Sequence, residues 1–311
     1  MKKVKRVVCV EVVMKGLRHG ITLVWQILLN IRVMEVSHEV PLTLLEGSRK
    51  FNDYDYALVH LLSRSFYREF FEESLKMGRR VILDNSMFEL GEAFEMREFA
   101  NAVFSLCPTE YVIPDVLGNS TETIHNMEKW NYWYRDKLIK RGCKSIGVVQ
   151  GRDLEEILNC FEHMRYNTDK VALSFYSPWY EDHFPFLSRE WACMYGRMLL
   201  VDILIERGYI KSNTKVHLLG CALPQEFRHY KGERYSFIET IDTSNPVVHG
   251  MKGIRYKSFG LDHKESDTDF PGNLPLHHHP AGSQQTHAQS VFLPDAPDRM
   301  DQALPSPVWK N

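Results

Sequence analysis

Short aliphatic runs alternate with longer segments of helical periodicity through most of this 311-residue chain. Strands that alternate with helices usually lie parallel in one sheet, with the helices packed against it. The eight expected strands are residues 32–37, 56–60, 80–84, 111–115, 145–150, 170–174, 215–219 and 237–242. Three of the intervening helices are expected at residues 65–78, 120–142 and 153–165, and the second of these would be capped by Ser120 or Thr121 and ended by Gly142.

The number and spacing of these strands favour an α/β fold of the (β/α)8 TIM-barrel type. Eight strand and helix pairs over about 210 residues suit this barrel, whose usual size is roughly 250 residues. A doubly wound open sheet is the alternative, but the chain has no glycine-rich dinucleotide fingerprint. We expect one barrel domain at residues 32–262, an irregular N-terminal extension at 1–31 and a tail at 263–311. Seven of the 14 prolines lie in residues 271–311, so the tail is expected to be disordered.

Charge and cysteine content exclude several classes of protein. The formal net charge is −2, so a nucleic acid would have to be bound by a local basic patch. The six cysteines include no C-x-x-C pair, which argues against a zinc ribbon or a disulfide scaffold and favours a reducing compartment. The apolar run at residues 21–29 is too short to cross a membrane. We therefore expect a cytoplasmic protein without membrane contact. The triplet His277–His279 is expected to bind metal only adventitiously, and no metal site is expected.

Polar residues stand at the ends of the expected strands. In a TIM barrel, catalytic groups come from the carboxyl ends of the strands. These ends carry Ser37, His38, His60, Asp84, Asp115, Gln150, Ser174, Gly220 and Asp242. Each aspartate taken alone is better explained as the cap of the following helix, because aspartate is favoured there. Three aspartates together with a glutamine favour a site at the barrel mouth.

Such a set suits displacement at a sugar carbon or another acetal centre. One carboxylate attacks or stabilises the cationic carbon, while a second moves the proton of the leaving group. A third carboxylate and an amide can recognise the edge of a purine, and Phe88 can stack on a flat base.

Four segments of the chain resemble the tRNA-guanine transglycosylase superfamily, whose members exchange guanine for a 7-deazaguanine. They read "ILDNSMFELG", "YVIPDV", "GVVQGRD" and "LLGCALPQEF…FIETIDTSNPVVHG", and the resemblance covers about residues 32–260. It implies that Asp242 is the nucleophile and that Asp84 assists proton transfer. It further implies a substrate-binding set made of Asn85, Ser86, Phe88, Asp115, Gln150, Gly151 and Gly220.

The chain also departs from the tRNA enzymes. It has no cysteine after Cys221, so it lacks the zinc element of their tRNA-binding subdomain. The glycine-rich stretch after the sixth strand is replaced by "LSFYSPWY", and the paired glycines after Asp84 are absent. This short form is most similar to the DNA-modifying branch of phages and bacterial modification islands. The resemblance implies that guanine in single-stranded or flipped DNA is replaced by 7-cyano-7-deazaguanine or a relative, without a cofactor and with accessory proteins possible.

Other functions remain open at this point. A tRNA-guanine transglycosylase, and a nucleoside or glycoside hydrolase, would use the same carboxylates. A non-catalytic nucleic-acid-binding barrel would use them only as caps. The basic stretch at residues 249–257 is expected to contact phosphates through His249, Lys252, Arg255 and Lys257. Trp130, Trp133 and Tyr134 share a helical spacing and are expected in the core.

Overall fold

The computed structural model describes residues 34–92 and 94–265. The expected extension at residues 1–31 lies outside this part of the chain, and so does the tail from residue 266 onward, including His277–His279. Residues 263–265, which the sequence assigns to the tail, are described and contact the last helix.

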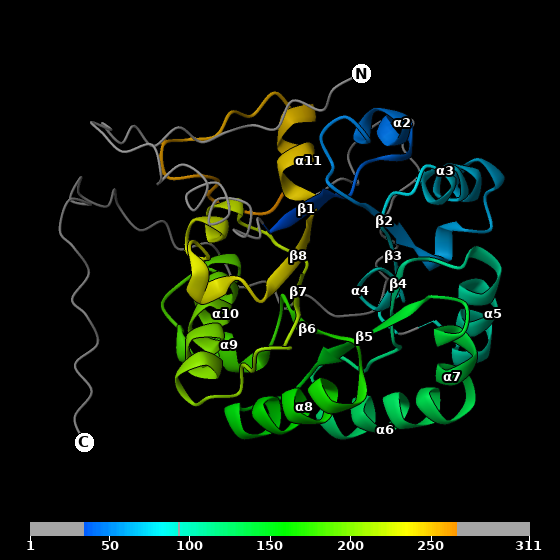
Figure 1. The fold of residues 1–311 in the computed structure, drawn as a ribbon. Coiled ribbons are helices and arrows are strands. Elements are labelled where there is room, and N and C mark those ends of the chain that lie inside the picture. The colour runs from blue at the N-terminus through cyan, green and yellow to red at the C-terminus, as the bar shows by residue number, and fades with distance from the viewer. Residues whose placement is uncertain (1–33, 93, 266–311) are drawn as a thin grey trace, which may run out of the picture. The chain divides into compact units, whose positions relative to one another are not determined.

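Eight parallel strands form one sheet that curves into a nearly closed barrel (Figure 1). Neighbouring strands follow the order β1-β8-β7-β6-β5-β4-β3-β2, and β1 and β2 contact each other to complete the ring. The strands are β1 (Glu35–His38), β2 (Asp55–Leu58), β3 (Val81–Asp84), β4 (Glu110–Val112), β5 (Lys144–Val149), β6 (Lys170–Ser174), β7 (Val216–Leu219) and β8 (Ile238–Thr243). The predicted (β/α)8 fold is confirmed, and the doubly wound alternative is wrong.

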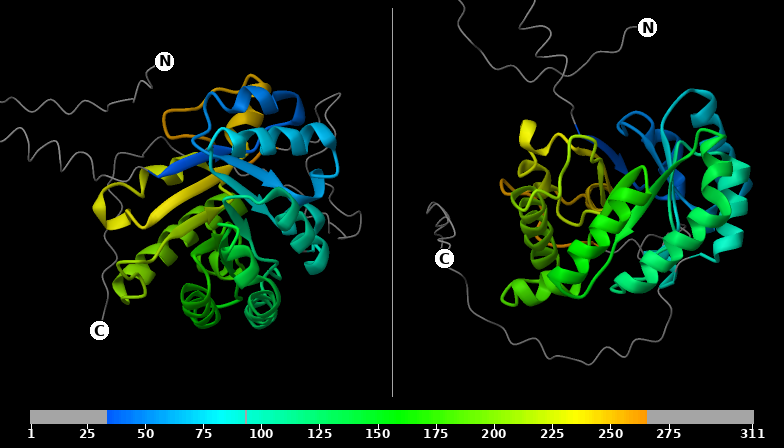
Figure 2. Two further views of the ribbon diagram at one scale, coloured as in Figure 1. Left: turned by 45° about the vertical axis from the view of Figure 1, so that its right-hand side comes forward. Right: turned by 60° about the horizontal axis from the view of Figure 1, so that its bottom comes forward.

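Helices follow the strands, and most of them lie outside the ring of strands (Figure 2), whereas α4 lies at the mouth of the barrel. They are α2 (Leu45–Ser48), α3 (Ser65–Lys76), α4 (Met87–Leu90), α5 (Met96–Leu106), α6 (Ser120–Trp130), α7 (Asp136–Ile139), α8 (Leu154–Asn167), α9 (Pro178–His183), α10 (Arg189–Glu206) and α11 (Asn245–Met251). Among the described residues, no helix combines the length and the apolar character that a membrane span requires.

The expected helix at residues 120–142 is not one continuous α-helix. Its cap is Asn119, one residue before the predicted Ser120, because the Asn119 side chain accepts a hydrogen bond from the Glu122 amide. A π-helical segment, Asn131–Arg135, separates α6 from α7. Gly142 has a φ of +80° and follows the end of α7, as expected for a helix terminator.

The π-helical segment also changes which aromatic side chains are buried. In an uninterrupted α-helix, residues 130, 133 and 134 would share one face. Trp130 is fully buried and donates to the Tyr111 hydroxyl at 3.2 Å, and Tyr134 packs against it. Trp133, however, is 58% exposed, so its predicted core position is wrong. The wider π turn breaks the 3.6-residue period on which the prediction depended.

A buried lysine and its polar partners lie inside the barrel. Lys170 of β6 lies with its ammonium 2.8 Å from Glu110 of β4, and 3.4 Å from both Glu239 and Thr240 of β8. Alternate strands of a TIM barrel contribute side chains to a common layer. This layer is polar, and the mutual pairing of its groups compensates for their loss of water.

Candidate functional site

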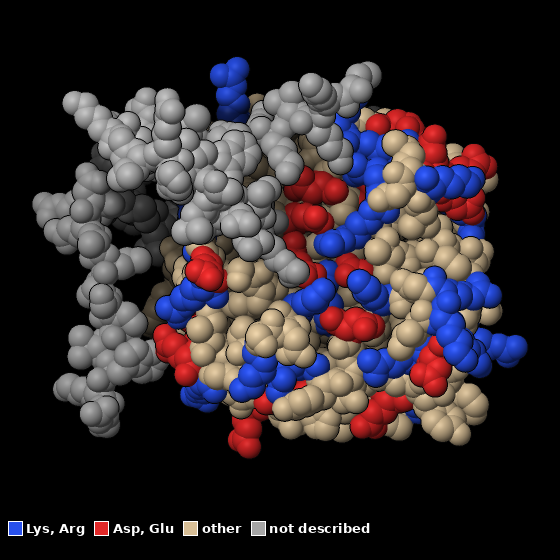
Figure 3. All heavy atoms as spheres, viewed as in Figure 1, with Lys and Arg blue, Asp and Glu red and all other residues tan. Residues whose placement is uncertain are grey.

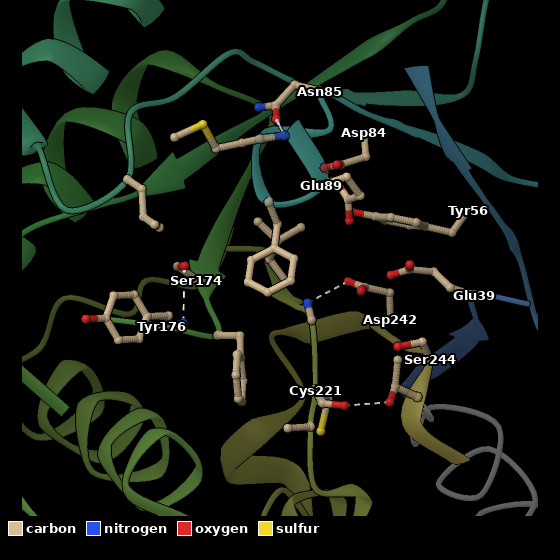
Figure 4. Close-up of a pocket in the computed structure, with 18 of the residues that line it drawn as sticks. Glu39, Tyr56, Asp84, Asn85, Glu89, Ser174, Tyr176, Cys221, Asp242 and Ser244 are labelled. Atoms are coloured by element: carbon tan, nitrogen blue, oxygen red, sulfur yellow. Dashed lines mark hydrogen bonds between the residues drawn. The ribbon is translucent and has the colours of Figure 1, made fainter. Parts of the chain in front are cut away.

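A pocket opens where the strands end, and its empty space, including the open mouth, is about 810 Å³. Seven of the predicted site residues line it: Asp84, Asn85, Phe88, Asp115, Gln150, Gly220 and Asp242. In Figure 4, Asp84 and Asp242 lie on the same side of the pocket, and Ser174 and Tyr176 lie opposite them.

Asp84 is the last residue of β3, and its carboxylate is held from two directions. The Tyr56 hydroxyl donates to Oδ1 at 3.0 Å, and the Ser86 amide donates to Oδ2 at 2.8 Å. Ser86 has a φ of +59°, a left-handed conformation that costs a non-glycine residue roughly 1–3 kcal/mol. Its hydroxyl bonds to His60 Nδ1 at 2.8 Å. Ser86 is fully buried beneath the pocket, where it orients Asp84.

Asp115 is held as a hydrogen-bond acceptor by two amide side chains. Asn85 Nδ2 donates to Oδ1 at 2.8 Å, and Gln150 Nε2 donates to Oδ2 at 2.7 Å. The Gln150 carbonyl in turn accepts from the Gly118 amide at 3.0 Å. Burial raises the pKa of Asp115, although the hydrogen bonds from the two amides act in the opposite direction. Residues that follow β3 and β5, the two neighbours of β4, thus fix this carboxylate before any ligand binds.

Gly151 is not among the residues that line this pocket. A Cβ at this position would lie 2.7 Å from the Ile157 backbone nitrogen, which is closer than packing allows. The residue type is therefore explained by the close approach of the chain to α8.

Asp242 lies in β8, and two groups from β7 and its end approach one of its oxygens. The Gly220 amide donates to Oδ1 at 2.9 Å, and His217 Nε2 lies 3.0 Å from the same atom but off the hydrogen-bond direction. His217 Nδ1 lies 2.9 Å from the Thr240 hydroxyl, which fixes the ring. Gly220 has a φ of +66°, so glycine suits the turn that presents this amide.

None of the three aspartates caps a helix. The residues at the starts of α4, α6 and α11 are Ser86, Asn119 and Ser244. The oxygens of Asp84, Asp115 and Asp242 instead bond to groups around the pocket. The capping explanation is therefore wrong for all three.

Two further carboxylates, Glu39 and Glu89, line the pocket and were not predicted. Glu39 follows the last residue of β1, so reading the strand end one residue further would have found it. Glu89 lies in the short helix α4 and is 6% exposed. Figure 4 shows Glu39 beside Asp242, and Glu89 beside Asp84 and Tyr56. Four carboxylates therefore share a small volume.

The crowding of carboxylates at the barrel mouth contributes to raised pKa values of Glu39 and Asp84. Burial raises the pKa of Glu39 well above its usual range, and the negative charges of Asp242 and Glu89 raise it further. Glu39 also shares a side-chain hydrogen bond with Asp242. Burial likewise raises the pKa of Asp84, with an added contribution from Glu89. The site can therefore keep a carboxylic acid protonated at a pH where an exposed carboxylate is ionised.

Replacing Glu39 by Gln is expected to make the protein more stable than wild type at pH 8, because the amide does not ionise, whereas burial opposes the ionisation of Glu39. Below the unfolded-state pKa, Glu39 is neutral in both states and the variant gains nothing. As pH rises, the unfolded chain releases its proton first, so the wild type loses stability relative to the variant until the folded-state pKa is passed. Urea unfolding at pH 5 and pH 8 measures this difference. A variant that is no more stable than wild type at pH 8 would contradict it.

The predicted phosphate-contacting residues do not form one exposed group. His249 is only 1% exposed, and Lys252 pairs with Glu265 at 2.7 Å. Arg255 and Lys257 are exposed, and Lys257 pairs with Asp262. On the face shown in Figure 3, basic and acidic side chains are interspersed over the described residues.

Lys264 is a basic pocket residue that the sequence analysis missed. It lines the pocket, and its ammonium lies 4.8 Å from the centre of the Phe88 ring, which is 47% exposed. Residue 264 was assigned to the expected tail, so it was not predicted as a site residue.

A comparison with known protein families found no match for this chain, and a search of curated proteins found no similar sequence.

Proposed function

We propose that this protein is a base-exchange enzyme that replaces guanine in DNA with a 7-deazaguanine such as 7-cyano-7-deazaguanine. The observation that carries the proposal is the meeting of Asp84, Asp115, Gln150 and Asp242 in one pocket. These polar groups suit three roles: Asp242 that of a nucleophile, Asp84 that of a proton carrier, and Asp115 with Gln150 that of base recognition. The segments that contain these residues resemble the transglycosylase superfamily, and this resemblance favours base exchange as the reaction.

In the first half-reaction, a carboxylate oxygen of Asp242 attacks C1′ of the deoxyguanosine. The bond from C1′ to N9 breaks, and its electron pair leaves with guanine. The Gly220 amide orients the nucleophile, and His217 lies beside the same oxygen. The result is an ester between Asp242 and the sugar.

A carboxylic acid must supply the proton that guanine needs as it leaves. Asp84 is assigned this role, because its raised pKa keeps the acid form available. In the second half-reaction, N9 of the incoming 7-deazaguanine attacks C1′ and the ester bond breaks. The N9 proton passes to the carboxylate that had given up its own. No net redox change occurs, and no redox cofactor or nucleoside triphosphate is required.

Asp115 is assigned to base recognition. Its oxygens are oriented by Asn85 and Gln150, and a carboxylate in this setting accepts from the N1–H and amino groups of a guanine-like edge. Phe88 at the rim can stack on the base. Lys264 above Phe88 can meet a phosphate of the bound strand.

The choice of DNA over tRNA leads to a direct test. We expect radiolabelled guanine or 7-deazaguanine to exchange into single-stranded or distorted DNA faster than into duplex DNA, because an unpaired base is least costly to flip. Exchange into tRNA of matched sequence is expected to be much slower. Affinity is expected to rest on a few phosphate contacts, and it should therefore fall as salt is raised. All substrates are compared at one fixed salt concentration.

Two outcomes of this assay would change the proposal. Label that enters tRNA but never DNA would overturn the DNA assignment and leave the base-exchange chemistry standing. Release of guanine without incorporation of label would instead favour a hydrolase that uses the same carboxylates.

A further inference from the structure

Three possible metal ligands meet beside α11, outside the pocket. His249, His263 and Glu265 each offer one ligand atom, and these atoms lie within 4.8 Å of one another. The two imidazole rings are 5.5 Å apart between centroids. Two histidines and one glutamate form a recognised set of protein ligands for zinc, with water or another group in the fourth position.

The hydrogen bonds around the cluster indicate which of its ligand atoms carry a proton. His249 Nδ1 lies 3.1 Å from the Asn245 carbonyl oxygen. A carbonyl only accepts, so Nδ1 carries the proton and Nε2 keeps its lone pair. Glu265 Oε2 accepts from Lys252 at 2.7 Å, while Oε1 lies 2.6 Å from His263 Nε2. The bonds to the Asn245 carbonyl and from Lys252 are outer hydrogen bonds of the kind that commonly orient metal-binding histidines and carboxylates. The bond between His263 and Glu265 joins two ligands, so a metal would replace the proton on His263 Nε2.

Asn245 holds the segment that supplies two of these ligands. Its Oδ1 accepts from the Glu265 amide at 2.9 Å, and its Nδ2 donates to the His263 carbonyl at 2.9 Å. Asn245 is 1% exposed, so these bonds are shielded from water. Residues 263–265 are thereby fixed against α11 by the backbone, and the ligand side chains need only small adjustments.

A surface ion pair accounts for only part of this arrangement. The side chains of Lys252 and Glu265 are half-buried and that of His263 is exposed, and their contacts are those of an ordinary charged network near the surface. They give no reason for a second imidazole, that of His249, to be buried with its ring beside His263.

We propose that His249, His263 and Glu265 bind one zinc ion, with a water as the fourth ligand. Zinc bonds of about 2.0–2.2 Å require ligand atoms roughly 3.4 Å apart. Ligand atoms that lie up to 4.8 Å apart must therefore approach one another, while His263 Nε2 and Glu265 Oε1, which are 2.6 Å apart, must separate. The 56% exposed side chain of His263 has the freedom to do so. Lys264 lies between two of the ligands and lines the pocket, so the metal also fixes this residue at the pocket rim.

The test is metal titration of the full chain, prepared without a histidine tag and stripped of metal with a chelator. His277, His278 and His279 are replaced by Ala to remove the adventitious ligands of the tail. We expect one equivalent of Co²⁺ to bind with the visible absorption of a four- or five-coordinate ion, and Zn²⁺ to displace it. Zinc should also raise the melting temperature, because it binds the folded state.

Two ligand variants, His263→Ala and Glu265→Gln, are made in the same background. Removing even an outer partner of a ligand costs about 10–100-fold in affinity, so loss of a ligand should cost at least about 100-fold. His163→Ala, an exposed histidine on α8, is the matched control and should bind normally. Melts without metal establish that each variant is folded; His249→Ala is avoided because that residue is buried.

Failure to bind one equivalent of Co²⁺ or Zn²⁺ would overturn the proposal. So would unchanged affinity in both His263→Ala and Glu265→Gln. The titration requires no nucleic acid and no turnover, so its outcome is independent of the base-exchange proposal.

Discussion

Asp242→Asn is expected to abolish base exchange, lowering its rate by about 10⁴-fold or more, as when other enzymes lose a nucleophile. The amide has nearly the size of the carboxylate but is a poor nucleophile, so the ester with C1′ cannot form. Its carbonyl can still accept from the Gly220 amide, and the fold should survive. Exchange of labelled guanine gives the rate, and mass spectrometry of the denatured protein detects the covalent adduct with DNA.

Asp182→Asn provides the matched control for this experiment. Asp182 is an exposed carboxylate on α9 and does not line the pocket. Its replacement should leave exchange unchanged. A covalent adduct that still forms in Asp242→Asn would show that another group is the nucleophile.

Asp115→Ala is expected to weaken binding of a 7-deazaguanine base by about 10²–10⁴-fold. The variant removes two hydrogen bonds to a charged acceptor, each contributing roughly 1.5–3 kcal/mol, and about 1.4 kcal/mol corresponds to a tenfold change in affinity. Asp115→Asn should also bind poorly, because its amide would place a donor against the donors of Asn85 or Gln150. Calorimetry with the free base measures both variants.

Thermal melting separates a lost contact from a lost fold in this series. Both variants should unfold cooperatively, and the Asp182→Asn control should bind the base like wild type. Unchanged affinity in Asp115→Ala would show that this carboxylate does not face the base.

Most of the fold could be predicted because barrel strands are short aliphatic runs with clear limits. Residues 170–174 were predicted to form a strand, and β6 spans the same residues. Local effects limited the rest. β4 ends at Val112, three residues before Asp115, and Pro114 cannot donate to a strand ladder. His60 was expected at a strand end, but β2 stops at Leu58 and His60 lies in the following 3-10 turn.

Only part of the candidate site could be predicted from the sequence, and the reason is different. Asp84 is the last residue of β3 and Asp242 the last but one of β8, so their convergence follows from the fold. The approach of His217 to Asp242 depends on how β7 and β8 lie side by side, which a single strand does not reveal. His249 was grouped with nearby basic residues by position along the chain. The packing of α11 buries it instead. The sequence could not predict this burial, because a run of charged residues does not indicate which side of a short helix faces inward.

The buried Lys170 has a consequence for the way the chain can be made. Its partners come from β4 and from β8, which the ribosome synthesises far apart in time. Until β8 docks, the ammonium lacks the acceptors on that side, and an incompletely paired buried charge typically costs about 3–5 kcal/mol. An unfinished barrel therefore has an electrostatic reason to stay open. The last strand completes the ring and the pairing of Lys170 in one step, which favours cooperative closure over a stable half-barrel.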